Sequence, residues 1–376
     1  MKNEFKIIFT GGGSGGHTMP AISLINTLRE YCNDNDIKLL ILYVGSHTGI
    51  EKDIATRNLI TYKSISTGKL RRYFSFKNFI DIFRILKGLI DSFFIIKKFK
   101  PDLLFSTGGF VSVPPVIIAK FLKVKTIIHE QTIDAGLANK IAGKFADKIC
   151  VTFNESKKYF PQHKTIVTGI PLRKEIFLST KEYAKKRYDF DYNRPTIFFT
   201  GGGLGCHLLN ETAIKIIPKL LEKVNIIFQT GNANGGNDHK IMKNLFNELP
   251  EKTRKNFIVY NFINDELADI LKLTDLAIAR SGAGTVCEFI ALKIPAIFIP
   301  LAIATNNEQY KNAMIMQSLG SAIILEEENL NENTLIDNIE SILFTDKLSL
   351  MKNNFNNIEN IDGREKILEL ILKDFN

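Results

Sequence analysis

Two short segments of the chain place glycines and a histidine in the same order. Residues 7–17 read IIFTGGGSGGH and residues 197–207 read IFFTGGGLGCH, so eight of the eleven positions are identical. Each segment has the pattern of a buried strand, a glycine-rich turn and the start of a helix. Such a turn exposes backbone N–H groups and the positive end of a helix dipole, which together favour an anion. The chemistry indicated is the binding of a phosphorylated ligand by each half of the chain.

The residues around the first glycine turn argue against two familiar kinds of nucleotide site. Gly11, Gly13 and Gly16 satisfy GxGxxG, but the end of the next expected strand, residues 42–46, reads LYVGS and lacks the acid that holds the ribose in dinucleotide sites. Neither turn contains the GxxxxGK[ST] motif of a P-loop. A single glycine cluster could be a tight turn that only packs a helix on a strand, whereas two matched clusters favour a bound ligand.

The elements that must position these turns follow a repeating strand and helix pattern. A chain of 376 residues exceeds the size of one ordinary hydrophobic core, so we expect two domains. Apolar runs of strand length alternate with helical patterns in both halves, which predicts an α/β fold with two doubly wound parallel sheets. The runs are residues 38–44, 103–107, 126–129, 149–153, 225–229, 257–260, 276–279 and 296–299.

Proline and glycine near residue 170 suggest where the domains meet. We expect a first Rossmann-like domain over residues 1–170, a hinge near Pro171 and a second Rossmann-like domain over residues 171–352. A last helix over about residues 353–376 could cross back to the first domain. Two Rossmann-like domains facing a cleft are the GT-B architecture, in which one domain holds a nucleotide sugar and the other holds the acceptor.

Composition narrows the class of partner. Lys and Arg total 49 against 40 Asp and Glu, a net charge of +9, which favours an anionic partner. Nucleic acid is disfavoured because no nucleic-acid-binding motif accompanies the charge. The four cysteines have no spacing that suits zinc, and the N-terminus has no signal-peptide pattern, so we expect a cytosolic protein with reduced thiols. No apolar run reaches the ~18 residues of a membrane span.

Residues 69–100 have the pattern of a basic amphipathic helix. Cations cluster at both ends, which suits the headgroup layer of an anionic membrane as well as an ordinary core-facing helix. Apolar residues at helical spacing are Phe76, Phe79, Ile80, Phe83, Leu86, Ile90 and Phe93. Further apolar residues, more than one helix face needs, are Ile82, Ile85, Leu89, Phe94 and Ile96. The excess predicts that some apolar surface is exposed and reaches a membrane.

Five motifs in order resemble one family across nearly the whole chain. They are GGSGGHTMP at residues 12–20, STGGFVS at 106–112, HEQ at 129–131, RSGA at 280–283 and EQY at 308–310. The combination resembles the MurG family of GT-B glycosyltransferases. The resemblance implies an inverting, metal-independent transfer of N-acetylglucosamine from UDP-N-acetylglucosamine (UDP-GlcNAc) to the C4 hydroxyl of lipid I. The product would be lipid II of peptidoglycan synthesis, made at the cytoplasmic face of the membrane, with other cell-wall synthesis proteins as possible partners.

On the acceptor side, the resemblance assigns roles to residues of the first domain. Imidazole readily accepts a proton near neutral pH, so His17 is the candidate general base, although it could instead only orient a phosphate. His129 and Glu130 would line the acceptor side. Substrate-binding positions on this side are Ser14, Gly15, Gly16 and Thr132.

On the donor side, the resemblance points to a turn after the expected strand 276–279. Ser281, Gly282, Ala283, Gly284 and Thr285 would meet the diphosphate or uridine through backbone N–H groups. Glu288 would bind the ribose hydroxyls, or else form a capping box with Thr285 in the first helical turn. Further donor positions are Arg173 near the diphosphate, Gly203 in the second glycine turn, Ile263 near the uracil and Gln309 near the sugar.

Several residues depart from the family pattern. Thr132 replaces the usual Asn, Gly203 and Leu204 replace Ser-Gln, and Phe110 and Ile170 replace the common Tyr and Asn. These departures keep two alternatives open. One is a GT-B enzyme that glycosylates another membrane lipid, such as diacylglycerol. The other is a non-catalytic relative that binds a UDP-sugar.

Overall fold

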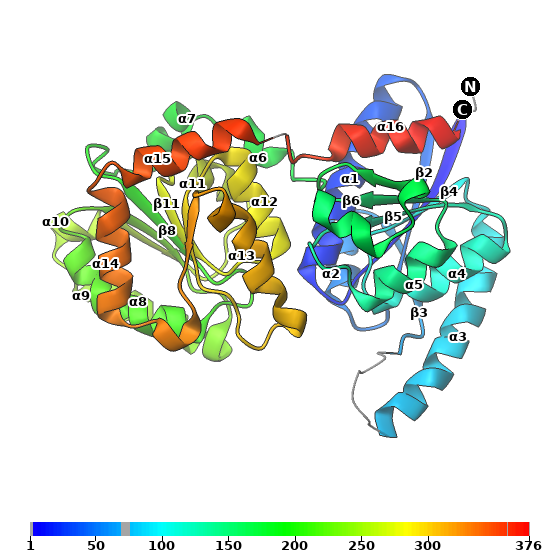
Figure 1. Cartoon of the computed structure of the whole chain (residues 1–376), viewed down its shortest axis with the longest axis horizontal. Coiled ribbons are helices and arrows are strands. Elements are labelled where there is room, and N and C mark those ends of the chain that lie inside the picture. The colour runs from blue at the N-terminus through cyan, green and yellow to red at the C-terminus, as the bar shows by residue number, and fades with distance from the viewer. Residues whose placement is uncertain (1–2, 69–75, 359, 376) are drawn as a thin grey trace. The chain divides into compact units, whose positions relative to one another are not determined.

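The chain forms two compact units, each built around a parallel sheet. The computed structural model describes residues 3–68, 76–358 and 360–375. One unit comprises Met1–Arg173 with Asn360–Asn376, and the other comprises Lys174–Glu359 (Figure 1). Both sheets are parallel and doubly wound, so the predicted fold class is confirmed.

The first unit has a seven-stranded sheet in the order β3-β2-β1-β4-β5-β6-β7. Its strands are β1 (Glu4–Thr10), β2 (Lys38–Ser46), β3 (Thr61–Ile65), β4 (Leu103–Ser106), β5 (Lys125–Glu130), β6 (Lys148–Val151) and β7 (Thr165–Val167). The sequence pattern did not indicate the edge strands β3 and β7. Both are short, and β3 is half-exposed with polar residues between its apolar ones, so neither presents a continuous apolar run.

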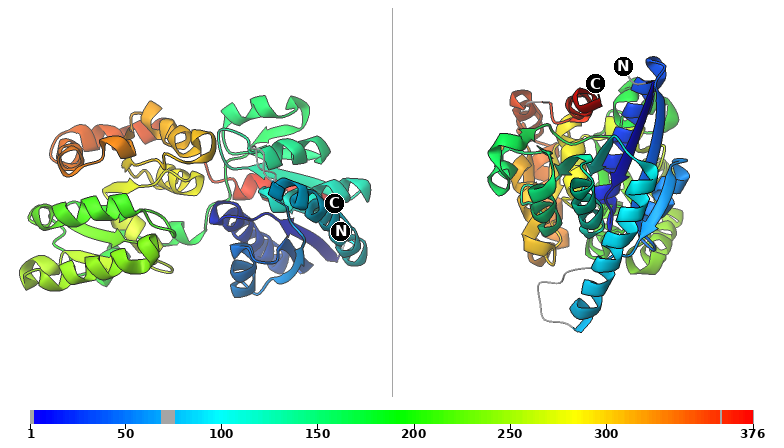
Figure 2. Two further views of the ribbon diagram at one scale, coloured as in Figure 1. Left: turned by 90° about the horizontal axis from the view of Figure 1, so that it is seen from below. Right: turned by 90° about the vertical axis from the view of Figure 1, so that its right-hand side faces the viewer.

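Helices cover both faces of this sheet (Figure 2). They are α1 (Gly15–Asp34), α2 (Ile50–Arg57), α3 (Phe76–Phe99), α4 (Val113–Phe121), α5 (Leu137–Phe145) and α16 (Arg364–Phe375), with short 3₁₀ turns η1 (Phe110–Ser112), η2 (Asn154–Tyr159) and η3 (Gln162–Lys164). Alternate residues of β1 point to the two faces: Ile7 and Phe9 enter the core shared with α1 and α16, whereas Ile8 enters the opposite core with Val116 of α4.

The last helix, α16, completes the first unit. Ile367 and Ile371 are fully buried in the core that contains α1. The chain reaches this position through a backbone pairing in which Ile170 N–H donates to Ile361 O (2.9 Å) and Gly363 N–H donates to Ile170 O (2.8 Å). The helix begins at Arg364 rather than near residue 353, because the residues before it form α15, a 3₁₀ turn and this pairing.

The second unit has a six-stranded sheet in the order β10-β9-β8-β11-β12-β13. Its strands are β8 (Thr196–Thr200), β9 (Asn225–Gln229), β10 (Phe257–Tyr260), β11 (Leu276–Ala279), β12 (Ala296–Phe298) and β13 (Ala322–Ile324). Its helices are α6 (Glu175–Leu178), α7 (Lys181–Arg187), α8 (His207–Leu220), α9 (Asn237–Glu248), α10 (Glu251–Arg254), α11 (Leu267–Leu273), α12 (Ala283–Leu292), α13 (Glu308–Ser318), α14 (Glu332–Leu343) and α15 (Lys347–Asn353). Short 3₁₀ turns are η4 (Ala233–Gly236), η5 (Thr305–Asn307), η6 (Glu327–Asn329) and η7 (Asn354–Asn357). One large core cluster lies between the sheet and the helices α8 and α14, and further buried residues such as Phe289 and Phe298 lie outside that cluster.

The burial of α16 generates a stability prediction. Ile371→Ala should destabilise the first unit by about 2–4 kcal/mol, because it leaves a cavity in a closed core. Hydrogen exchange followed by mass spectrometry should show faster exchange in β1 and α1, with β8 and β9 unchanged. Lys366→Ala on the exposed face of the same helix is the control. Equal exchange rates in the wild type and Ile371→Ala would show that burial of α16 does not stabilise the first unit.

Candidate active site

The first glycine turn lies where the strand order of the first sheet reverses. β1 and β4 are neighbours, and the chain proceeds from them to opposite edges of the sheet. Their following loops touch, because Gly12 N–H donates to Gly108 O (3.2 Å) and Thr107 N–H donates to Thr10 O (2.9 Å). In doubly wound sheets, ligands bind at the carboxyl ends of the strands beside this switch point.

A buried carboxylate holds the first glycine turn in place. Glu51 is fully buried and accepts hydrogen bonds from Gly13 N–H (3.2 Å), Ser46 N–H (2.9 Å) and the Ser46 hydroxyl (2.5 Å). A Cβ at Gly12 would lie 2.5 Å from Glu51 Cδ, so this close approach requires glycine. Sequence reasoning missed Glu51, because only the folded chain brings α2 beneath the turn.

The turn opens directly into the N-terminus of α1. Ser14 is the N-cap residue in an extended conformation, and among the contacts of the described residues its side chain caps no N–H group. Ser14 and Gly16 are exposed and Gly15 is half-buried. The first-turn N–H groups of a 20-residue helix can therefore meet an anion here.

His17 is held in one tautomer by the loop after β4. Its Nδ1 lies 3.0 Å from Thr107 O and 3.1 Å from Gln131 Oε1. A carbonyl oxygen can only accept, so Nδ1 carries a proton, and in the neutral tautomer the lone pair lies on Nε2. Gln131 is buried and also donates from Nε2 to Thr107 O (2.7 Å). Gln131 thus orients the imidazole, a role that the HEQ motif alone did not reveal.

His129 and Glu130 lie beneath the loop surface. His129 is fully buried, and its Nε2 donates to Gly169 O (2.8 Å). Glu130 is 2% exposed and accepts from the Thr132 hydroxyl (2.9 Å), Gly136 N–H (3.1 Å) and Asn139 Nδ2 (3.0 Å). Glu130 and the divergent Thr132 therefore make contacts within the segment that follows β5, whereas the His129 side chain contacts the backbone after β7.

The second unit repeats the switch-point arrangement between β8 and β11. The second glycine turn follows β8, and Gln229 Nε2 donates to Gly202 O (3.1 Å) to hold it. Gly203 is exposed, and a Cβ there would lie 3.0 Å from the ring of Phe262. His207 Nδ1 donates to the buried carboxylate of Asp238 (2.9 Å).

The loop after β11 leads into α12 as the sequence predicted, but the helix begins differently. Gly282 is the N-cap residue and Ala283 the first helical residue. Glu288 therefore lies in the second turn, and the capping box between Thr285 and Glu288 is wrong because Thr285 is already inside the helix. Gly282, Ala283, Gly284, Thr285 and Glu288 are all half-buried.

Ser281 and Gln309 fasten the donor-side loops to each other. Ser281 is fully buried, and its hydroxyl donates to Gln309 O (2.8 Å), while Gln309 Oε1 accepts from Leu301 N–H (3.0 Å). Ile263, in the loop after β10, is 4% exposed. Arg173 is the last residue of the first unit before the chain enters the second. The predicted donor positions from 203 to 309 thus follow carboxyl ends of strands of one parallel sheet.

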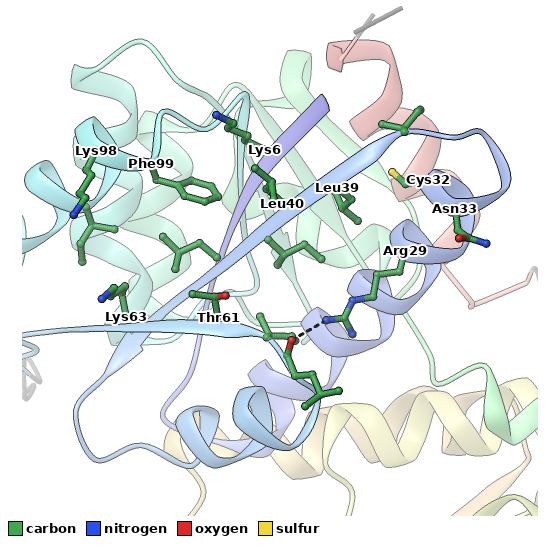
Figure 3. Close-up of a pocket in the computed structure, with 16 residues that line it drawn as sticks. Lys6, Arg29, Cys32, Asn33, Leu39, Leu40, Thr61, Lys63, Lys98 and Phe99 are labelled. Atoms are coloured by element: carbon green, nitrogen blue, oxygen red, sulfur yellow. Dashed lines mark hydrogen bonds between the residues drawn. The ribbon is translucent and has the colours of Figure 1, made fainter. Parts of the chain in front are cut away.

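Two further observations concern the described part of the chain. It contains no cluster of three or more His, Cys, Asp or Glu side chains that could hold a metal ion, and none of its helices is long and apolar enough to cross a membrane. A hollow of about 730 Å³ lies between β2 and the last turns of α1 and α3, lined by Arg29, Leu40, Lys98 and other side chains (Figure 3). None of the predicted site residues lines it.

Family models match both units of the chain. The glycosyltransferase family 28 N-terminal domain matches residues 7–151, and the glycosyltransferase family 28 C-terminal domain matches residues 196–367. The crystal structure of MurG from Acinetobacter baumannii superposes with a TM-score of 0.74 at 24% identity, covering 98% of this chain and 99% of that one. Together with the two switch-point loops, these matches define a glycosyltransferase with the GT-B fold.

Curated relatives narrow the class further. The UDP-N-acetylglucosamine--N-acetylmuramyl-(pentapeptide) pyrophosphoryl-undecaprenol N-acetylglucosamine transferase of Clostridium perfringens is 41% identical over 366 residues, 95% of this chain and 98% of the relative. The enzyme of the same name from Borrelia hermsii is 38% identical over 379 residues, with coverage of 100% and 98%. The chain belongs to the MurG family.

The burial of His129 predicts an acid-sensitive fold. Burial lowers the pKa of His129 from its ordinary 6.5 to about 4, against the raising effect of its hydrogen bond to Gly169 O. As the pH falls, His129 therefore takes up its proton in the unfolded chain before it does so in the folded chain. The contribution of neutral His129 to the free energy of unfolding is fully present above about pH 6.5 and is lost as the pH drops towards about 4. His129→Gln should be less stable at pH 7 but should lose less stability between pH 7 and pH 5.

Denaturant unfolding at several pH values measures this slope, and His163→Gln at an exposed position is the control. Equal slopes for the wild type and His129→Gln would show that another group carries the acid sensitivity.

Proposed function

We propose that this chain transfers N-acetylglucosamine from UDP-GlcNAc to the C4 hydroxyl of the N-acetylmuramyl residue in lipid I, giving lipid II and UDP. The observation that carries the proposal is the fixed tautomer of His17 at the switch point of the first sheet. The names of relatives that align with nearly the whole chain support the same donor and acceptor.

The chemistry begins with the acceptor hydroxyl. Its oxygen attacks the anomeric carbon, its proton passes to Nε2 of His17, and the bond from the anomeric carbon to the diphosphate breaks. The electron pair of that bond leaves with UDP. Because the hydroxyl attacks in a single displacement from the face opposite the diphosphate, the configuration inverts. His17 can take the proton because Thr107 O and Gln131 Oε1 keep the other proton on Nδ1.

The leaving diphosphate needs positive partners. The N-terminal N–H groups of α12, from Gly282 to Thr285, are the donor-side groups that suit this charge. We expect Glu288, in the second turn of the same helix, to accept hydrogen bonds from the ribose hydroxyls. We expect these groups and Arg173 to hold the diphosphate without a metal ion.

Buried His129 and Glu130 take a positioning part in this proposal. Glu130 accepts hydrogen bonds from the segment that follows Gln131, and His129 ties the end of β5 to Gly169 O. Gln131, the next residue, in turn orients His17. Ser14, Gly15 and Gly16 offer the acceptor the open N-terminus of α1.

The lipid acceptor requires that the enzyme work at a membrane surface, and α3 supplies an apolar face. Exposed fractions of its apolar side chains reach 61% at Phe83, 51% at Leu86, 58% at Ile90 and 64% at Phe94. The helix faces its own unit with Gly88, Ser92 and Ile96, which are buried. Residues 69–75 of the expected membrane segment lie outside the described residues. We therefore place α3 in the headgroup layer at the cytoplasmic face, where nearby Lys and Arg each add ~1 kcal/mol.

The transfer itself can be tested with single substitutions. UDP release from UDP-GlcNAc with a short-chain lipid I analogue should require the acceptor and should continue in EDTA. His17→Ala should lower kcat by about 10²–10⁴-fold because the general base is lost. Glu288→Ala should raise KM for UDP-GlcNAc by about 10-fold or more, as expected when a charged hydrogen-bond acceptor is removed.

His163→Ala, at an exposed position, is the matched control for His17→Ala. Transfer to diacylglycerol but not to the lipid I analogue would favour the alternative that the enzyme glycosylates another membrane lipid. UDP-GlcNAc binding without turnover on any acceptor would favour the non-catalytic alternative.

The membrane role of α3 gives a separate prediction. Phe83→Ser with Leu86→Ser should weaken binding to vesicles that contain anionic phospholipid by about 10–100-fold, because two apolar side chains no longer enter the membrane. Sedimentation with vesicles measures binding, and kcat with a short-chain acceptor should change little. Leu350→Ser, which alters a comparably exposed leucine in α15, is the control. Unchanged sedimentation of the double variant with vesicles would rule out membrane binding through this face of α3.

A further inference from the structure

A second hollow of the first unit lies beside the first glycine turn. It measures about 520 Å³ and is lined by residues 47–48 after β2, residues 66–67 after β3, the first half of α3 and η1. The size is that of a site for a small ligand or for one part of a larger one. None of the substrate-binding or catalytic positions that the resemblance assigned lines it, although Phe110 of the STGGFVS motif does.

The walls of this hollow are cationic and rich in hydroxyl groups. Arg84 and Lys87 of α3 line it together with His47, Thr48 and Thr67. The one carboxylate in the lining is Asp81, which is 2% exposed and binds Arg84 Nη1 at 3.2 Å. Lys87 is exposed, and no ion pair to it is found among the described residues. Cations and hydroxyls around one carboxylate that is already paired favour an anion with several oxygens, such as a diphosphate.

Close packing of α3 on the sheet sets the position of these cations. A Cβ at Gly88 would lie 2.2 Å from Ser66 O, so the helix backbone lies directly against the end of β3. Asp91, further along the helix, accepts from Ser66 N–H (2.9 Å). Arg84 precedes Gly88 by about one turn and Lys87 precedes it directly, and both line the hollow beside the residues that follow β2 and β3.

The hollow lies between two parts of the site already described. On one side, Arg84 and Lys87 each follow directly after an exposed apolar residue of α3, Phe83 and Leu86. On the other side, Phe110 lines the hollow and also contacts the glycine turn, because a Cβ at Gly13 would lie 2.8 Å from Phe110 Cε1. The order through the unit is apolar helix face, cationic hollow, glycine turn and His17.

We infer that this hollow binds the diphosphate of the lipid-linked acceptor, with Lys87 and Arg84 as its main partners. The inference rests on the proposed function. In such an acceptor the diphosphate joins an apolar chain to the sugar, which is the same order that the protein presents. The membrane-facing side of α3 takes the chain, the hollow takes the diphosphate and His17 meets the sugar hydroxyl.

The test compares acceptors that differ only in this group. Lys87→Gln should raise KM for a short-chain diphosphate acceptor by about 10-fold or more in a neutral detergent, with KM for UDP-GlcNAc unchanged. With a matched monophosphate acceptor, the wild type and Lys87→Gln should differ by less than about 3-fold. Arg84→Lys, which keeps a partner for Asp81 but loses the planar fork, should show a smaller loss of the same kind.

Lys144→Gln on α5 removes the same charge from an exposed position of the same unit and should leave KM for the diphosphate acceptor unchanged. Neutral detergent removes any contribution from anionic phospholipid headgroups. If Lys87→Gln raised KM for the acceptor only when anionic vesicles were present, the cations would bind membrane headgroups, and the inference would be wrong. It would also fall if Lys87→Gln lost as much affinity for the monophosphate acceptor as for the diphosphate acceptor.

Binding of a fluorescent short-chain diphosphate acceptor, measured without UDP-GlcNAc, separates this inference from the proposed function. Weaker acceptor binding by Lys87→Gln, with no turnover by the wild type, would support diphosphate binding in the hollow and contradict the proposed transferase activity. Full turnover by the wild type, with unchanged acceptor binding by Lys87→Gln, would support the transferase activity and contradict diphosphate binding in the hollow.

Discussion

The acceptor-side site depends on one carbonyl oxygen, that of Thr107. It accepts hydrogen bonds from His17 Nδ1 and from Gln131 Nε2, so a single acceptor at the end of β4 joins the turn after β1 to the loop after β5. The carbonyl also fixes a proton on Nδ1, so in the neutral ring the lone pair lies on Nε2. Buried Glu51 and Glu130 support the two outer loops by accepting their backbone N–H groups.

The second unit repeats the same kind of sheet topology but presents a different set of groups. Its switch point lies between β8 and β11, and the groups presented there are mainly backbone N–H groups at the starts of helices. Side chains such as Ser281 and Gln309 are used to fasten loops to each other. Dipoles fixed in this way suit a charged diphosphate, because they need not reorganise when the charge on the leaving group grows.

In the proposed function, helix α3 links the membrane to the site within the first unit. Gly88 lets its backbone lie against β3, which turns Phe83, Leu86 and Ile90 outward and brings Arg84 and Lys87 beside the residues that follow β2 and β3. A helix that exposes this much apolar surface would be costly in a protein that never meets a membrane or a partner. The exposed face and the cationic hollow are therefore two consequences of one packing contact.

The sequence by itself determined the two α/β units and their glycine turns, because apolar periodicity and glycine runs are local properties; the limits of β9, β10 and β11 agree with the apolar runs. It also indicated that part of the segment before residue 100 is exposed, but not which face, and it missed the short edge strands. Tertiary structure decided what each polar residue contacts. His17 and Gln131 are 114 residues apart, and whether Glu51, His129 and Glu130 lie at the surface or beneath it depends on which distant loops cover them. Such burial comes from long-range packing, which residue types and spacing do not encode locally.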